Sequence, residues 1–195
     1  MSSPGASYST AFSCMILAGA GGYCLKNIEN FCRCAISNDL SKCSFIIVIV
    51  NSVIGIWRYG NPVYGQAVDK LHKVTTAVQD LVVLPMIVAI LMEKYNCHIE
   101  MIYGCLAAPV IPLICSIIGT DTLKTDFEKL VTFFGCAGVA YLCYMNNNYY
   151  GAATCLSSII KVFCSDDNSL KIPSQDLRNY AMCFFTYFAL KAITD

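Results

Sequence analysis

The sequence predicts an all-α protein: a multi-pass transmembrane bundle of about six or seven helices that forms one integral membrane domain, residues 1–195. Hydrophobic residues make up 56% of the chain and charged residues only 13%, whereas an average soluble domain has about 25% charged residues. The apolar residues gather in segments close to the length of about 20 residues that a membrane-spanning helix needs. In a bilayer, helix is the structure in which such a segment pairs its backbone groups internally.

Seven segments are expected to be helical, each bounded by polar residues, glycine or proline. They cover residues 7–25, 43–57, 66–94, 99–119, 130–145, 149–164 and 173–193. The first segment ends at Lys26 and the second at Trp57 and Arg58, which are side chains typical of a membrane interface. Residues 27–42 between them are polar, and we expect a loop there that contains a short helix.

The later segments are separated by clear interruptions. The third is predicted to be one long helix with a polar first half, whereas the fourth contains Pro109 and Pro112, and proline inside a helix frees carbonyl groups and kinks it. Residues 120–129 are polar and are predicted to be a connection. Residues 146–148, all asparagine, predict a tight turn, and residues 166–171 a loop.

Four polar residues lie within or beside the apolar segments and are the candidate intramembrane site residues: Asp80, Lys161, Asn51 and Glu100. Ionisable residues inside a membrane are expensive to bury and commonly mark a functional site. Asp80 directly precedes the apolar run of residues 81–92. It either lies at headgroup depth on the polar half of its helix, which we favour, or faces the bundle and binds a cation or relays a proton.

The other three candidates also have structural interpretations. Lys161 is expected to extend its long stem so that its ammonium group reaches the interface, and a buried pair with Asp80 is the alternative. Glu100 suits the N-terminus of a helix, where the helix dipole favours an acid. Asn51 is expected to form hydrogen bonds between helices.

The sequence contains no recognisable catalytic or metal-binding pattern. Its two histidines, His72 and His98, belong to no HExxH motif or His–carboxylate cluster, and no nucleophile elbow or P-loop is visible. We therefore expect no enzyme activity, cofactor or metal. A lipid-modifying membrane enzyme that uses Asp80, Glu100 and the histidines is the remaining alternative. The formal net charge of zero gives no electrostatic support for nucleic-acid binding.

The chain has thirteen cysteines, and more than half of them fall in apolar segments. There we expect them to pack as small hydrophobic residues. This group comprises Cys14, Cys105, Cys115, Cys136, Cys143, Cys155 and Cys183.

Small residues form two faces on which helices can approach closely. Ala18 and Gly22 have the small-xxx-small spacing, and Gly135 and Gly138 lie one turn apart. We expect these faces to pack within the chain or against other membrane proteins, with membrane lipids as the other partner. The expected function is a non-catalytic accessory, scaffold or assembly partner. The alternative is a small transporter or channel that uses Asp80 and the kinked fourth segment.

Both ends of the chain resemble the transmembrane protein 276 family. The matching residues are Gly5, Ala6, Tyr8, Ser9, Thr10 and Ala11 at the start, Leu84 and Pro85 in the middle, and Pro173, Asp176, Leu177, Tyr180, Ala181, Thr186, Tyr187, Lys191 and Ala192 at the end. Family members commonly have tryptophan where Tyr8, Tyr180 and Tyr187 stand, and a glycine-rich aromatic stretch in place of residues 146–151. The resemblance implies a small multi-pass membrane protein and assigns no site residues.

Overall fold

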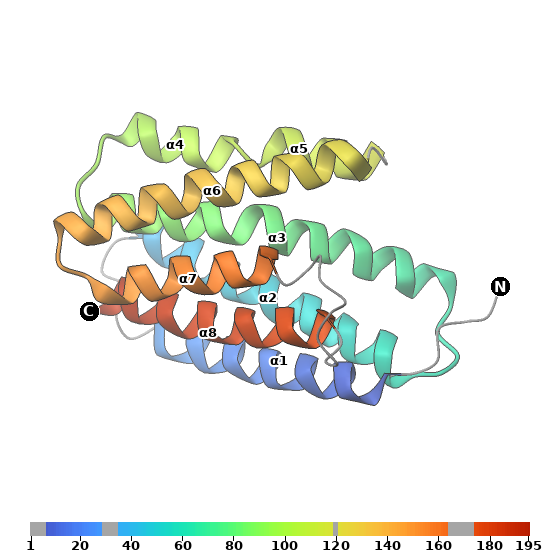
Figure 1. The fold of residues 1–195 in the computed structure, drawn as a ribbon. Coiled ribbons are helices and arrows are strands. Elements are labelled where there is room, and N and C mark those ends of the chain that lie inside the picture. Colours follow the sequence, from blue (N-terminus) through green and yellow to red (C-terminus); the bar gives the residue numbers. More distant parts are fainter. Residues whose placement is uncertain (1–6, 29–34, 119–120, 164–173) are drawn as a thin grey trace.

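The computed structural model describes residues 7–28, 35–118, 121–163 and 174–195, and within these ranges it contains α-helices and no strands (Figure 1). The helices are α1 (Tyr8–Ile28), α2 (Ala35–Gly60), α3 (Gln66–Lys94), α4 (Ile99–Ala107), α5 (Val110–Ile118), α6 (Asp121–Met145), α7 (Tyr149–Phe163) and α8 (Ser174–Thr194). The all-α prediction is confirmed. Because α4 and α5 are two halves of one broken segment, the helices correspond to the seven segments predicted.

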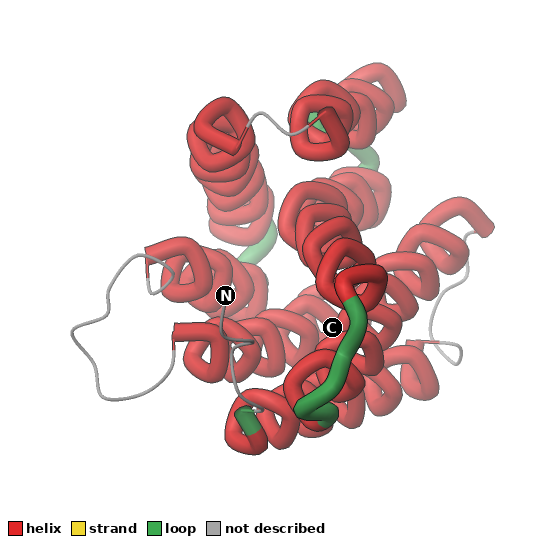
Figure 2. Tube along the Cα trace, turned by 90° about the vertical axis from the view of Figure 1, so that its right-hand side faces the viewer, coloured by secondary structure: helices red, strands yellow, loops and turns green. Residues whose placement is uncertain are grey.

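The helices run roughly alongside one another, as the view along the bundle shows (Figure 2). α3 is the central helix and packs against α2, α4, α5, α6 and α8. α1 packs between α2 and α8, and α7 packs between α6 and α8. The first and last helices of the chain, α1 and α8, therefore lie side by side, and α8 also contacts α3.

The middle and second half of α3 form the core of the bundle. From Gln79 to Leu91 every residue except Val82 and Met86 is buried. The apolar core around this stretch draws Leu17 and Cys24 from α1 and Phe45 and Val48 from α2, together with residues of α6, α7 and α8 such as Val139, Cys155 and Phe185. Burial of apolar surface on this scale is the main favourable contribution to helix packing in water, and in a bilayer close packing takes that role.

The predicted kink in the fourth segment is confirmed at Pro109. This proline lacks an N–H, and it occupies the turn that separates α4 from α5. Pro112 does not break the helix, because it lies in the first turn of α5, where backbone N–H groups have no partner within the helix.

The asparagine turn is also confirmed. Residues 146–148 connect α6 to α7, and Asn147 has a φ of 54°, a left-handed conformation that asparagine tolerates better than most residues. The side chain of Asn148 donates to the Tyr95 hydroxyl and to the Ala192 carbonyl, at 2.9 and 2.8 Å. The turn is thereby tied to the ends of α3 and α8.

One predicted connection is helical instead, and another holds the start of a helix that is longer than expected. The predicted connection at 120–129 is wrong, since α6 begins at Asp121. Leu123, Phe127 and Leu130 recur at helical spacing there, so the fall in hydropathy marks a more polar part of the helix. The short helix expected within residues 27–42 is the beginning of α2, which starts at Ala35. The predicted loop at 166–171 lies outside the described residues.

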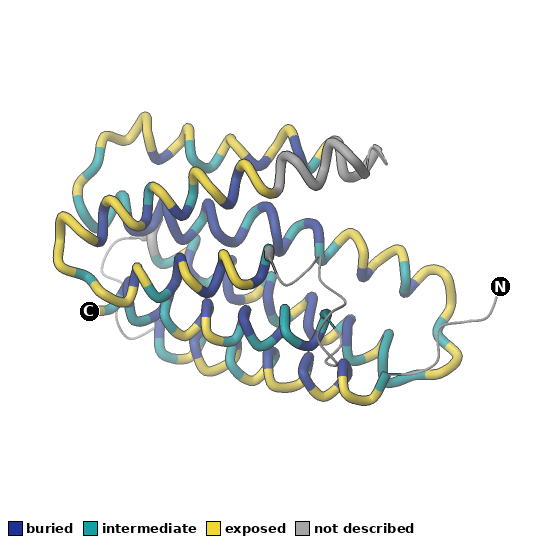
Figure 3. Tube along the Cα trace, in the orientation of Figure 1, coloured by how far each residue is buried: buried dark blue, intermediate teal, exposed yellow. Residues whose placement is uncertain are grey.

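Two helical stretches are long and apolar enough to cross a membrane, Asn38–Gly60 and Gln66–Lys94. Two shorter apolar stretches are Ile99–Ile114 and Lys129–Met145. Exposed positions recur along the peripheral helices (Figure 3), and many of them carry large apolar side chains. On α2, Ile46, Val50, Val53 and Trp57 form one exposed stripe at helical spacing.

The two small-residue faces are used differently. A Cβ atom at Gly135 would lie 2.9 Å from Leu84 Cδ2 and one at Gly138 would lie 3.7 Å from Val88 Cγ1, so this face packs α6 against α3. On α1, Gly21 packs against Ile49 of α2. Gly19 and Gly22 have no atoms of other elements within 4 Å of a built Cβ, which leaves part of this face open.

We expect Gly21→Ala to destabilise the bundle and the neighbouring Gly22→Ala to be tolerated. The Gly21 Cβ would lie 2.8 Å from Ile49 Cγ1, and overpacking of this kind costs about 1–3 kcal/mol. The measurement is the melting temperature of each purified variant in detergent, where about 2–4 °C is lost per kcal/mol in a chain of this size. Equal melting temperatures would contradict the α1–α2 packing described.

Candidate functional site

The Asp80 carboxylate lies inside the bundle, where it contacts two cations from other helices. Lys161 Nζ on α7 lies 3.2 Å from Asp80 Oδ1, and Arg178 Nη2 on α8 contacts Asp80 Oδ2. The side chains of Asp80 and Lys161 are only 2% and 7% exposed. We call Asp80, Lys161 and Arg178 the ion cluster.

The ion cluster changes two interpretations of the sequence. Lys161 does not extend to the surface, so that prediction is wrong, and its alternative, the buried pair with Asp80, is what the structure contains. Asp80 is buried and faces the bundle, which agrees with the alternative interpretation and not with the favoured one, a place at headgroup depth. Arg178 was not anticipated, because it lies near the polar beginning of α8 and nothing local indicates that it turns inward.

Asn51 links α2 to α3, as predicted. Its amide nitrogen donates to Gln79 Oε1 at 2.9 Å, and its carbonyl oxygen accepts from the hydroxyls of Thr75 and Thr76 at 2.8 and 3.1 Å. The side chain of Asn51 therefore uses both of its polar atoms between helices. Glu100 lies in the first turn of α4 and is exposed, which fits its predicted role at a helix N-terminus.

A further polar cluster joins α1 to α8 and was not predicted. Asp176 accepts from the hydroxyls of Ser9 and Ser13 at 2.5 and 3.2 Å. Asn179 donates to Ser13 Oγ at 2.9 Å and to Cys14 Sγ at 3.2 Å. One feature of the sequence could have indicated this cluster: Asp176 and Asn179 are three residues apart, which places both on one face of α8.

A fourth polar group consists of His72, which is buried, together with Arg58 and Asp69. Arg58 Nη1 lies 2.9 Å from His72 Nδ1, and Arg58 Nη2 lies 2.6 Å from Asp69 Oδ1. The Tyr59 ring packs edge-on against His72 with ring centroids 5.5 Å apart. A Cβ atom at Gly55 would lie 2.7 Å from Cys14 Sγ and 3.4 Å from His72 Nε2, so this group adjoins the α1–α8 cluster.

These four polar groups occupy one half of the bundle. They draw on the first halves of α1, α3 and α8 and the second half of α2, with Lys161 from α7. The other half of the core is mainly apolar, from Phe45 and Ile28 to Leu91 and Ala189, with a few buried hydroxyls such as those of Ser44 and Thr186. Buried ionic and amide side chains thus gather in one half of the core, while many large apolar side chains are exposed on the outside of the bundle.

The ion cluster is suited to holding helices in register and to sensing protonation. Each ion buried away from water loses hydration worth several kcal/mol, which is recovered only when its partner is correctly placed. Protonation or neutralisation of Asp80 would remove the charge that both cations contact. The cluster therefore links the charge state of one carboxyl group to the packing of α3, α7 and α8.

The side chains named in the lipid-modifying alternative are not brought together. His98 and Glu100 are exposed beyond the end of α3, and Lys94 at that end lies about 21 Å along the helix from Asp80 at 1.5 Å per residue. His72 lies about 12 Å from Asp80 in the other direction by the same measure. Among the described residues, no group of three or more His, Cys, Asp or Glu side chains is placed to hold a metal ion.

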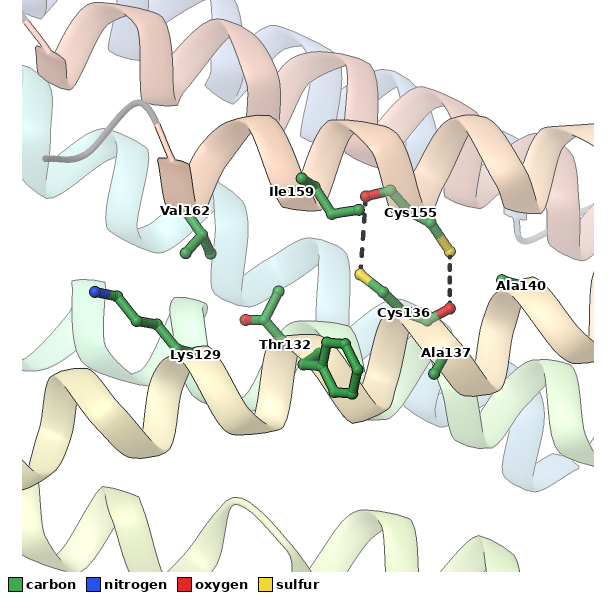
Figure 4. Close-up of a pocket in the computed structure, with 9 residues that line it drawn as sticks. Lys129, Thr132, Cys136, Ala137, Ala140, Cys155, Ile159 and Val162 are labelled. Atoms are coloured by element: carbon green, nitrogen blue, oxygen red, sulfur yellow. Dashed lines mark hydrogen bonds between the residues drawn. The ribbon is translucent and has the colours of Figure 1, made fainter. Parts of the chain in front are cut away.

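A cavity of about 680 Å³ lies elsewhere, between α6 and α7 (Figure 4). Its lining is mostly apolar and includes Phe133, Ala137 and Ile159, with Lys129 and Thr132 as polar members. Cys136 and Cys155 both line it, and they contact each other from the two helices.

Comparison with protein-family models, with curated proteins and with solved structures finds no match to this chain.

We expect Asp80→Asn to destabilise the protein by about 3–5 kcal/mol, because removing one partner of a buried ion pair has an effect of that size. Glu100→Gln is the matched control, since this exposed acid should change stability by no more than about 0.5 kcal/mol. Melting temperatures of both variants in the same detergent provide the measurement. If the two variants melt together at the wild-type temperature, the ion cluster does not hold the bundle.

Proposed function

We propose that this chain is a multi-pass integral membrane protein that acts as an accessory or assembly partner of other membrane proteins, without catalysis of its own. The observation that carries the proposal is the combination of buried ionic and polar groups with large apolar side chains exposed on the outside of the bundle. Asp80, Asn51 and their partners are buried, whereas peripheral helices expose side chains such as Phe133, Phe134 and Trp57.

A bilayer accounts for both halves of this pattern. Lipid covers apolar side chains without penalty, whereas in water an exposed apolar surface of this extent would favour aggregation. Inside the membrane, buried polar side chains stabilise helix contacts because unpaired polar groups are unfavourable in hydrocarbon. The resemblance to the transmembrane protein 276 family supports the same proposal of several membrane-spanning helices.

The outer face of α1 is the surface on which we place the partner. Gly19 and Gly22 are exposed between the exposed side chains of Met15 and Tyr23, and a Cβ at either glycine would meet open space. Small residues of this kind let a second transmembrane helix approach closely enough for its backbone to contact α1. Within the chain, Gly135 and Gly138 already perform this role between α6 and α3.

We expect a tagged form of the full chain, purified in mild detergent, to carry a stoichiometric membrane-protein partner that native mass spectrometry detects. Gly22→Leu should reduce the amount bound by about tenfold, equivalent to about 1.4 kcal/mol of binding energy, because the leucine side chain would hold the partner helix away from α1. Gly104→Leu is the matched control, because Gly104 is exposed on α4 and its Cβ would also contact nothing within 4 Å.

Retention of the partner by Gly22→Leu would rule out the α1 face as its binding surface. A wild-type protein that purifies with lipid alone would contradict the assembly function itself.

A small transporter or channel is the second candidate, and the ion cluster favours it. Asp80 lies at the midpoint of α3, with fourteen residues on either side of it in the helix Gln66–Lys94. The α4–α5 segment that packs on α3 is broken at Pro109, and helices interrupted within the membrane are common at the binding sites of transporters. In this mechanism, a proton or cation bound by Asp80 competes with Lys161 and Arg178.

If the protein is a transporter or channel, we expect protons or monovalent cations to enter liposomes that contain the purified protein faster than they enter protein-free liposomes. Asp80→Asn should reduce the flux to background, since the amide cannot take up a proton or pair with a cation in the same way. Glu100→Gln should retain it. A flux that is unchanged in Asp80→Asn, provided that circular dichroism gives the same helix content, would exclude Asp80 as the coupling residue.

A further inference from the structure

Cys136 on α6 and Cys155 on α7 face each other and interact reciprocally. Cys136 Sγ lies 3.8 Å from the Cys155 carbonyl oxygen, and Cys155 Sγ lies 3.3 Å from the Cys136 carbonyl oxygen (Figure 4). Each side chain therefore reaches the backbone of the other residue across the helix interface. Both cysteines are free thiols in this structure.

The cavity between α6 and α7 gives a small reagent access to both sulfurs. The two residues are only 7% and 6% exposed on the molecular surface, yet both line the cavity of about 680 Å³. A cavity beside buried thiols gives a small reagent a route to them, and access of this kind distinguishes reactive cysteines from inert buried ones.

The other described thiols in the helices lack this arrangement. Cys24 donates to the carbonyl oxygen of Thr186 at 3.4 Å, and Cys105 to that of Pro85 at 3.5 Å. Cys14 Sγ accepts from Asn179. Among the described cysteines, the reciprocal contact is particular to Cys136 and Cys155, which makes the remaining cysteines useful internal controls.

We propose that Cys136 and Cys155 form a redox-active dithiol, which a small peroxide oxidises to an intramolecular disulfide between α6 and α7. In the first step one thiol sulfur attacks the peroxide O–O bond, which breaks to give a sulfenic acid and, with hydrogen peroxide, one water molecule. In the second step the other thiol attacks the sulfenic sulfur, forming the S–S bond and releasing a second water. Two electrons pass from the sulfurs to the peroxide oxygens.

The bond links two helices that otherwise meet through the turn at residues 146–148 and through side-chain packing. The two cysteines are nineteen residues apart in sequence, so the disulfide closes a helical hairpin and restricts the unfolded chain. Oxidation therefore stabilises the α6–α7 pair and fixes the width of the cavity that these helices enclose. A thiol reductant reverses the change.

The test uses the full-length protein in lipid nanodiscs, first reduced and then exposed to hydrogen peroxide. Remaining thiols are blocked with N-ethylmaleimide, and the protein is digested without reductant for mass spectrometry. We expect a cross-linked peptide pair containing Cys136 and Cys155, lighter by two hydrogen atoms than the sum of the two free peptides. It should disappear after treatment with dithiothreitol. Oxidation should also raise the melting temperature.

Matched variants separate the proposal from general oxidation. Cys136→Ser and Cys155→Ser should each abolish the cross-link and the rise in melting temperature, whereas Cys143→Ser, two turns further along α6, should leave both unchanged. Recovery of Cys136 and Cys155 as maleimide adducts after peroxide treatment would overturn the proposal. Cross-links of either residue mainly to other cysteines would overturn it as well.

Discussion

The buried carboxylate of Asp80 is the constraint on which the arrangement of three helices depends. Its two cationic partners come from positions 81 and 98 residues further along the chain. A shift of α7 or α8 by one turn along α3 would displace a cation by about 5.4 Å and leave a buried charge without its partner. Apolar packing tolerates many such shifts, whereas the ion cluster tolerates few. The register of α3, α7 and α8 follows from this difference.

The remaining buried polar groups extend the same principle to α1 and α2. Asn51 fixes α2 against α3, and Asp176 with Asn179 fixes α8 against α1. Each contact is a modest hydrogen bond, yet the same polar group buried without a partner would be much less favourable. The other half of the bundle relies on the packing of residues such as Phe45 and Leu91. One half of the bundle therefore specifies the register of the helices, and the other half contributes close packing.

Local sequence signals were sufficient for most of the helices and insufficient for the site. The bounds of α3 and the break at Pro109 could be predicted because apolar runs, proline and glycine act within a few residues. The beginning of α6 was missed because its charged residues were read as a loop. Asp80 and Lys161 were recognisable as unusual, but Arg178 was not, because a contact across 98 residues leaves no local trace in a single sequence.

α8 is synthesised after the helices that it contacts, and this order has a consequence for folding. Arg178 leaves the ribosome about 5–20 s after Asp80 at about 5–20 residues per second, and Asp176 follows Ser9 by a longer interval still. During that time the earlier helices hold polar side chains whose α8 partners have not been made. A nascent chain halted before α8 would leave Asp80 without Arg178, and the hydroxyls of Ser9 and Ser13 without Asp176. The native packing of the earlier helices therefore depends on the synthesis of α8.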